Sequence, residues 1–257
     1  MSHQPGQAPL LIACALAIEH LALRSGDHTG ADGPLTLLRT GMGPRAAERS
    51  VTRMLAAPHL DGAAVLATGF CAGLAPGMHP GDLVVAEEAR DPRGTTRCVG
   101  TELLVKELTR AFPRRTVHTG PLTGSDHVVR GQERSELRAT GAIAVDMESA
   151  ATLYGAVRAG ERPVAAVRVV VDAPEHELVR IGTLRGGISA FRVLRAVLPV
   201  SSNGTVPCCS PGGEPDGHAA ASDHQGGDVS LRTEAAQAGQ VSAHRGTGTP
   251  LRLQSEV

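Results

Sequence analysis

Two carboxylates flank a methionine in the stretch Ala144-Val145-Asp146-Met147-Glu148-Ser149-Ala150, where a short apolar run gives way to small residues. The run Ile143–Val145 has the character of a buried strand, and the residues from Ser149 onward have the character of a helix. A carboxylate at the carboxyl end of such a strand points into the crevice where open α/β sheets bind ligands. Taken alone, the stretch predicts either a ligand-binding site or an ordinary capped strand end.

Apolar runs of strand length alternate along the chain with segments of helical periodicity. The expected strands are Leu10–Ala17, Leu35–Leu38, Ala63–Thr68, Leu83–Ala86, Thr116–Leu122, Ile143–Val145 and Pro163–Val171. The expected helices are Arg45–Ala57, Thr101–Phe112, Ser149–Ala159 and Gly187–Leu198. This alternation predicts one three-layer α/β/α domain over residues 9–199, in which helices cover both faces of a mixed, largely parallel sheet.

The composition changes at both ends of this predicted domain. Residues 1–8 precede the first strand, and we expect them to be disordered. Residues 200–257 are dense in Gly, Ser, Ala, His and Gln and contain no Ile, Phe, Met or Tyr. Such a segment buries too little apolar surface to offset the entropy lost on ordering, so we expect a disordered tail. A shifted reading frame would also account for this composition.

The composition of the chain argues against several classes of partner. The 257 residues have a formal net charge of −1, no Trp and one Tyr, which leaves neither the basic patch nor the stacking surface of a nucleic-acid binder. Five scattered cysteines and eleven histidines lack the spacing of a metal site or a disulfide framework. The N-terminal apolar run is too short to span a bilayer. We therefore expect a cytoplasmic protein with no bound metal.

Two glycine-rich stretches would let a ligand approach the backbone closely. The first, Thr68–Gly77, follows a predicted strand and includes Gly69 and Phe70. The second, Gly41–Arg45, places a proline at the first helical position, so the N–H groups of the next helix could bind an anion. Each has an ordinary alternative: a connection between strands for the first, and a helix start with a solvated Arg45 for the second.

Two further carboxylates follow predicted strands. Asp172 ends a β-branched run, and Glu19 lies just past the first strand. Because strand ends meet at one edge of a parallel sheet, we expect Asp172 to lie near Glu148. Proximity of two carboxylates can raise the pKa of one of them enough for it to act as an acid near neutral pH.

Four blocks of sequence together resemble the nucleoside phosphorylase and nucleosidase superfamily. They are the first strand followed by Glu19, the block from Thr68-Gly69 to Gly81-Asp82-Leu83-Val84-Val85, the Asp-Met-Glu motif at residues 146–148, and Arg168-Val169-Val170-Val171-Asp172. They occur in the expected order and cover roughly residues 9–199. The resemblance implies the fold of that superfamily, cleavage of an N-glycosidic bond, and no organic cofactor. Inorganic phosphate would be the co-substrate of a phosphorylase.

The resemblance also implies roles for individual residues. Glu148 would bind the ribose 2′- and 3′-hydroxyls, with Met147 packed beneath the ribose. Asp172 would protonate or hydrogen-bond N7 of a purine base, and Glu19 would activate water as a general base. Val128 stands where the adenine-specific nucleosidases have a Phe that stacks on the base.

Three features depart from the pattern of those relatives. Phe70, next to Gly69, replaces the serine of their Gly-Ser-Ala-Gly-Gly loop on the side of the nucleophile. Val171 replaces the serine before the catalytic aspartate, which removes a hydrogen bond that would orient Asp172. The arginines that hold phosphate in bacterial purine phosphorylases have no match, so Arg45 is the local candidate for that role.

Within the superfamily, the stretches Thr123–Val129 and Leu184–Gly187 and the Asp-Met-Glu-Ser form of the central motif are most similar to the hopanoid-associated phosphorylase branch. That resemblance implies removal of adenine from adenosylhopane, a small-molecule nucleoside with an apolar substituent. We also expect a homo-oligomer, specifically a dimer, and association with a membrane surface to reach such a lipid. The alternatives are a methylthioadenosine/S-adenosylhomocysteine nucleosidase, a futalosine hydrolase, and an inactive homologue that only binds nucleosides.

Overall fold

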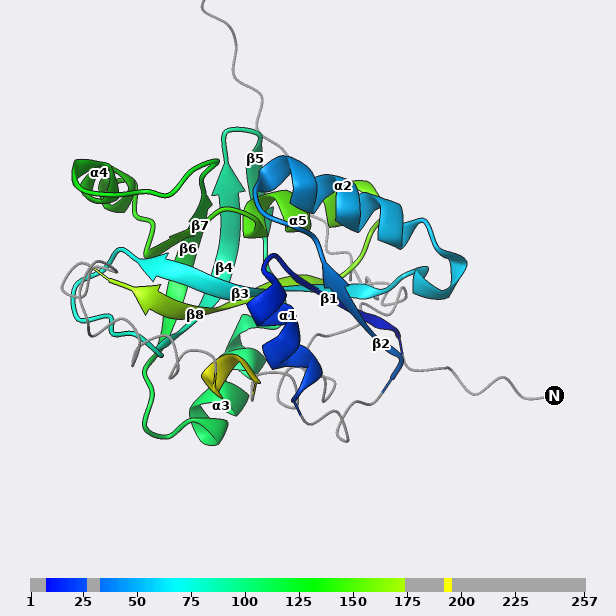
Figure 1. Cartoon of the computed structure of the whole chain (residues 1–257), viewed down its shortest axis with the longest axis horizontal. Helices are drawn as coiled ribbons and strands as arrows, with labels where there is room; N and C mark the ends of the chain where they lie inside the picture. The colour runs from blue at the N-terminus through cyan, green and yellow to red at the C-terminus, as the bar shows by residue number, and fades with distance from the viewer. Residues whose placement is uncertain (1–7, 27–32, 174–191, 196–257) are drawn as a thin grey trace, which may run out of the picture. The chain divides into compact units, whose positions relative to one another are not determined.

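The computed structural model describes residues 8–26, 33–173 and 192–195, which form a β-sheet covered by helices (Figure 1). The strands are β1 (Leu10–Cys14), β2 (Leu35–Arg39), β3 (Ala64–Gly73), β4 (Leu83–Asp91), β5 (Gly94–Arg97), β6 (Val117–Gly124), β7 (Ala144–Asp146) and β8 (Val164–Asp172). The helices are α1 (Ala17–Arg24), α2 (Pro44–Leu55), α3 (Thr101–Ala111), α4 (Gln132–Ala139), α5 (Ser149–Arg158) and the short 3₁₀ helix η1 (Pro58–Leu60).

The sheet is mixed, as expected. The pairs β1–β2, β1–β3, β3–β8, β4–β6 and β6–β7 are parallel, and the pairs β3–β7, β4–β5 and β4–β8 are antiparallel. Helices cover both faces. The core between α2, α5 and the sheet contains Val51, Leu55 and Leu153, and the core on the other side contains Leu23 from α1 and Leu104 from α3. The predicted α/β/α layering is confirmed.

Five of the strands close into a ring, whereas the sequence suggested an open sheet. β3 pairs with β7 and β8, β8 also pairs with β4, and β6 joins β4 to β7. The closure depends on β3, which pairs with β8 along most of its length and reaches β7 only through Ala72 and Gly73. The register shifts between Cys71 and Ala72 because β8 has an extra residue there, Val171, and this bulge lies where β3 also begins to pair with β7. Alternation of elements along the chain carries no information about such pairing.

The structure also corrects the expected boundaries. The first strand ends at Cys14, and α1 begins at Ala17 where the strand was expected to continue. The helix α4 and the strand β5 were not predicted. Arg134 is the buried residue of α4, so the helix has no apolar stripe to reveal it.

Several expectations concern residues outside the described part of the chain. They include disorder over most of residues 1–8 and over residues 200–257. Of the expected helix Gly187–Leu198, the structure describes only residues 192–195, which are helical. None of the helices in the described ranges is long and apolar enough to cross a membrane.

Candidate active site

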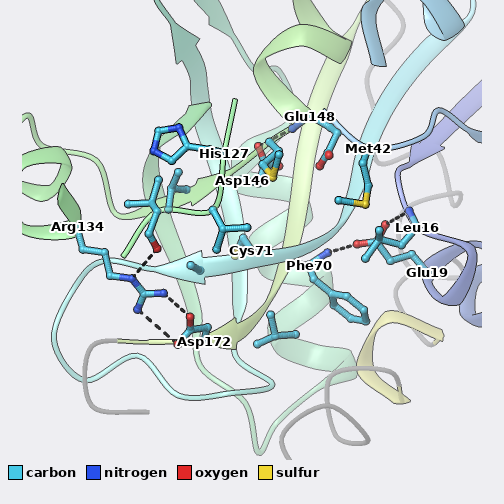
Figure 2. A pocket seen from close by; sticks show the side chains of 16 residues that line it. Leu16, Glu19, Met42, Phe70, Cys71, His127, Arg134, Asp146, Glu148 and Asp172 are labelled. Carbon is cyan, nitrogen blue, oxygen red and sulfur yellow. Dashed lines mark hydrogen bonds and ion pairs between the residues drawn. The ribbon is translucent and has the colours of Figure 1, made fainter. Parts of the chain in front are cut away.

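A cavity of about 250 Å³ opens where the last residues of β3, β7 and β8 come together with the loops after β1 and β6 (Figure 2). The residues that line it are Leu16, Glu19, Met42, Phe70, Cys71, Ala72, His127, Val128, Val129, Arg134, Val145, Asp146, Met147, Glu148, Val171 and Asp172. Six of the predicted site residues are in this set: Glu19, Phe70, Val128, Met147, Glu148 and Asp172. Segments spread over more than 150 positions of the sequence therefore contribute to one cavity.

Glu148 lies at the start of α5 and is held by a distant loop. Its Oε1 accepts a 2.8 Å hydrogen bond from the backbone N–H of Gly43, which immediately precedes α2. Gly43 has φ = 86°, a conformation that favours glycine. Oε2 accepts no hydrogen bond from the described residues, so it can take hydroxyl donors from a ligand. Burial raises the pKa of Glu148, and this effect is opposed by the charge of Arg168 and the Gly43 hydrogen bond.

A buried ion pair joins Arg168 to Asp146, which lines the cavity. The Nε of Arg168 lies 2.7 Å from Oδ2 of Asp146 and also donates to the hydroxyl of Ser149. Nη1 donates to the carbonyl of Thr68 at 2.9 Å. Burial by itself would lower the pKa of Arg168, but the carboxylates around it, Asp146 first, raise the pKa and keep it cationic. Asp146 in turn accepts from the backbone N–H of Ser149 and caps α5.

Glu19 is buried and held by three backbone donors. Its Oε2 accepts from the N–H groups of Ala15 and Leu16 at 2.9 and 2.8 Å, and its Oε1 accepts from the N–H of Phe70 at 2.7 Å. Three hydrogen bonds of this kind fix the rotamer of the side chain. Gly69 (φ = 133°) allows this approach, because a Cβ there would lie 2.5 Å from Oε1 of Glu19. Gly69 is therefore not a lining residue of the cavity, but its lack of a side chain makes room for the carboxylate of Glu19.

Asp172, at the end of β8, pairs with Arg134 from α4 across another part of the cavity (Figure 2). Nη2 of Arg134 donates to Oδ2, and Nη1 lies 3.4 Å from Oδ1. The Nε of Arg134 donates to the carbonyl of Val129 at 3.3 Å. The ion pair therefore joins the loop before α4 to the end of β8.

Apart from His127, the remaining walls are apolar or neutral. Val128 and Met42 are 58% and 64% exposed, so both lie at the open side of the cavity. Cys71 lines the wall, and burial, with a contribution from the carboxylate of Asp146, raises the pKa of its thiol. The thiol is therefore neutral near pH 7 and a poor nucleophile.

Arg45 is not among the residues that line the cavity. It lies in the first turn of α2, on the side of His127 and Asp126. The hydrogen bond from His127 lowers the pKa of Asp126, and the charge of Arg45 adds a smaller contribution in the same direction. A role for Arg45 in holding phosphate stays a prediction.

The family of the chain follows from a match between the model of one protein family and residues 23–198, which supply all the residues that line the cavity except Leu16 and Glu19. The model is that of the phosphorylase superfamily. The chain belongs to this superfamily. The expectation of a nucleoside-cleaving enzyme is confirmed at this level. A comparison with curated proteins found no significant match.

Solved structures of superfamily members have the same fold. The 5′-methylthioadenosine/S-adenosylhomocysteine nucleosidase of Neisseria meningitidis is 19% identical, with a TM-score of 0.66 over 77% of this chain and 99% of that one. The corresponding nucleosidase of Colwellia psychrerythraea, solved with adenine, is 18% identical, with a TM-score of 0.62 over 78% and 97%. The futalosine hydrolase of Helicobacter pylori is 16% identical, with a TM-score of 0.59 over 76% and 97%. At these identities the likeness concerns the fold.

Sequence reasoning gave no role to Arg134, Arg168 or Asp146. A signal existed for Arg168, because a charged residue inside the β-branched strand that ends at Asp172 requires a buried partner. Asp146 was visible beside Glu148, but its pairing with Arg168 was not. Nothing marked Arg134, which lies in a segment of surface-like composition.

Proposed function

We propose that this superfamily member cleaves the N-glycosidic bond of a purine nucleoside. The observation that carries the proposal is the placement of Glu19, Glu148 and Asp172 around a single cavity of about 250 Å³. Each carboxylate has a different environment: backbone donors for Glu19, one backbone donor for Glu148 and a guanidinium for Asp172. Different environments suit different chemical roles.

Glu148 suits recognition of the sugar. With Oε1 held by Gly43, its other oxygen can accept from the ribose 2′- and 3′-hydroxyls and orient the ring. Met147 lines the cavity beside it and supplies an apolar surface for the ribose.

Asp172 is suited to help the purine base leave. A purine leaves poorly from an oxocarbenium-like centre, so a proton or hydrogen bond given to N7 lowers the barrier. Val128 also lines this cavity and would contact the base. Because Val128 has no aromatic ring to stack on the base, recognition of the purine depends more on the carboxyl group of Asp172.

Glu19 suits activation of the nucleophile. Its fixed carboxylate can accept a proton from water as the water attacks the ribosyl carbon. In a phosphorolytic reaction, phosphate would lie on the side of the Gly69-Phe70 loop, and Arg45 is the candidate that the sequence offers for holding it, although Arg45 does not line the cavity. The carboxylate of Glu19 on this wall favours neutral water over a phosphate anion.

For the substrate we propose adenosylhopane, as the hopanoid-branch motifs suggest. Two exposed apolar side chains at the open side of the cavity, Met42 and Val128, support a nucleoside with an apolar substituent. Ile18 and Leu21 add exposed apolar surface on α1, which suits a dimer contact or a membrane surface. Cleavage of methylthioadenosine, S-adenosylhomocysteine or futalosine fits the same carboxylates.

The test is the release of base from adenosylhopane, methylthioadenosine, S-adenosylhomocysteine and futalosine, with and without inorganic phosphate. Chromatography of the products distinguishes ribose derivatives from their 1-phosphates. We expect adenine release that does not depend on phosphate. If no nucleoside is cleaved although one binds in calorimetry, the chain is an inactive nucleoside-binding homologue.

A further inference from the structure

The carboxylate of Asp172 has one partner among the described residues, the guanidinium of Arg134. The two side chains are only 8% and 9% exposed, although both line the cavity. The residue before Asp172 is Val171, whose side chain has no hydrogen-bonding group. The orientation of this carboxylate therefore depends on Arg134.

Arg134 is itself held in place. It is the buried residue of the otherwise polar helix α4, and its Nε donates to the carbonyl of Val129. The need to fill an apolar core does not explain the burial of a single arginine, because burying a cation is costly without a partner. Figure 2 shows the side chain extending from α4 to Asp172 across the cavity wall.

The two carboxylate oxygens are not equivalent in this pair. Nη2 donates to Oδ2, whereas Oδ1 lies 3.4 Å from Nη1, at the limit of a hydrogen bond. A protonated Asp172 can keep Oδ2 as the acceptor of the guanidinium while Oδ1–H faces a base. The geometry thus leaves one oxygen for a ligand without breaking the contact with Arg134.

We propose that Arg134 is the positioning residue of the acid: it directs Oδ1 of Asp172 towards the base and stabilises the carboxylate that proton transfer leaves behind. This inference rests on the proposed function. Asp172 takes up a proton from solvent before the reaction. As the C1′–N9 bond breaks, its electron pair goes to the purine, that proton moves from Oδ1 to N7, and water attacks C1′ while Glu19 accepts a proton from the water. The guanidinium attracts the resulting carboxylate more strongly than the neutral acid, so it stabilises the transition state more than the bound substrate.

The experiment measures kcat and KM of the full-length chain on two ribosides. One is the best purine nucleoside of the wild type, and the other is 4-nitrophenyl β-D-ribofuranoside, whose leaving group departs without protonation. We expect Arg134→Met to lower kcat on the purine nucleoside by about 10²-fold, with KM nearly unchanged, and to leave the nitrophenyl substrate largely unaffected. Arg138→Met, an exposed arginine on the same helix, is the matched control and should match the wild type.

Two further variants separate positioning from a merely structural role. Arg134→Lys keeps the positive charge but lacks the planar guanidinium that can donate to both carboxylate oxygens. Its kcat should therefore lie between those of the wild type and Arg134→Met. The double variant Arg134→Met/Asp172→Asn should be no slower than Asp172→Asn alone, because Arg134 acts through Asp172. Equal losses on both ribosides, or losses that multiply in the double variant, would overturn the inference. A wild-type protein that cleaves no riboside overturns the proposed function and this inference with it.

Discussion

The backbone N–H of Gly43 donates a 2.8 Å hydrogen bond to Oε1 of Glu148, which is 105 positions further along the chain. Each residue belongs to a stretch that was ambiguous in the sequence: a glycine turn that could bind an anion, and an acidic pair at a strand end. The structure connects the two stretches, because the N–H of the turn donates to the carboxylate of Glu148. The loop before α2, which contributes Met42 to the cavity, is thereby tied to the start of α5.

Replacing Glu148 with Gln should weaken substrate binding and lower turnover together. The amide accepts less strongly from two hydroxyls, and its NH₂ group presents donors to the hydroxyls or to the N–H of Gly43. We expect kcat/KM to fall by roughly 10- to 100-fold, the value of one or two hydrogen bonds to a charged group. Glu136→Gln, on the exposed face of α4, is the control. Unchanged kinetics in the Glu148 variant would remove this residue from the site.

The raised pKa of Glu148 predicts how stability depends on pH. Because burial raises this pKa above the ordinary value of 4.5, the folded state binds the proton more tightly than the unfolded state. The contribution to stability is therefore full below pH 4.5 and is lost as pH rises through the folded-state pKa. Urea unfolding of the wild type and of Glu148→Gln should give a difference in free energy that declines over this window. A difference that is constant with pH contradicts the assignment.

Replacing Arg168 with Met should destabilise the fold strongly. The substitution leaves Asp146 buried without its charged partner, and breaking such a pair costs about 3–5 kcal/mol. The control is Arg110→Met, which breaks the exposed pair of Arg110 with Glu107 and should change stability by less than about 1 kcal/mol. Both values can be measured by denaturant unfolding. Similar small losses in the two variants would show that the buried pair is not required.

Gly69→Ala and Gly94→Ala separate crowding from backbone strain. Both glycines have a large positive φ, 133° and 143°, so alanine is strained at either position by about 1–2 kcal/mol. Only at Gly69 would the new Cβ meet other atoms, those of Glu19 and Arg168. We expect Gly94→Ala to retain its activity and Gly69→Ala to lose it, because Glu19 is displaced. Equal activity of the two variants would place Glu19 outside the reaction.

Asp172→Asn should distinguish an enzyme from a binding protein. The amide keeps the size of the side chain and can donate a hydrogen bond, but it cannot transfer a proton. We expect similar affinity for a purine nucleoside and a turnover at least about 10²-fold lower, while a riboside with an activated leaving group is spared. If the variant cleaves purine nucleosides as fast as the wild type, Asp172 is not the acid.

The layers of the fold could be predicted from the sequence because segments with the apolar pattern of strands alternate with segments that have the periodicity of helices. It also predicted that Glu19, Glu148 and Asp172 follow strands, and these residues line one cavity. The closed ring could not be predicted, since pairing between β3, β7 and β8 includes a bulge at Val171 and depends on contacts between distant segments. Periodicity along the chain does not report either of them.

The side chains that pair with the carboxylates could not be predicted from the sequence, for a related reason. An ion pair such as Arg134 with Asp172 joins residues 38 positions apart, and α4 also contains an exposed arginine, Arg138, from which the sequence does not distinguish Arg134. Arg168 was different, because its strand is otherwise apolar and buried. A charged residue in such a context predicts a buried partner even when the partner cannot be named.

The ring also bears on synthesis of the protein. The chain emerges from the ribosome with its N-terminus first, so β3, β4, β6 and β7 leave the exit tunnel before β8. The strand β8 pairs with both β3 and β4. Until residue 172 has emerged, those two strands present unpaired edges to the solvent, and Arg134 lacks the carboxylate of Asp172. The nascent chain is thus exposed to aggregation for as long as translation of the segment from β7 to β8 takes. Slow codons in this segment would lengthen that interval, and a chaperone bound at the edges of β3 and β4 would protect the chain during it.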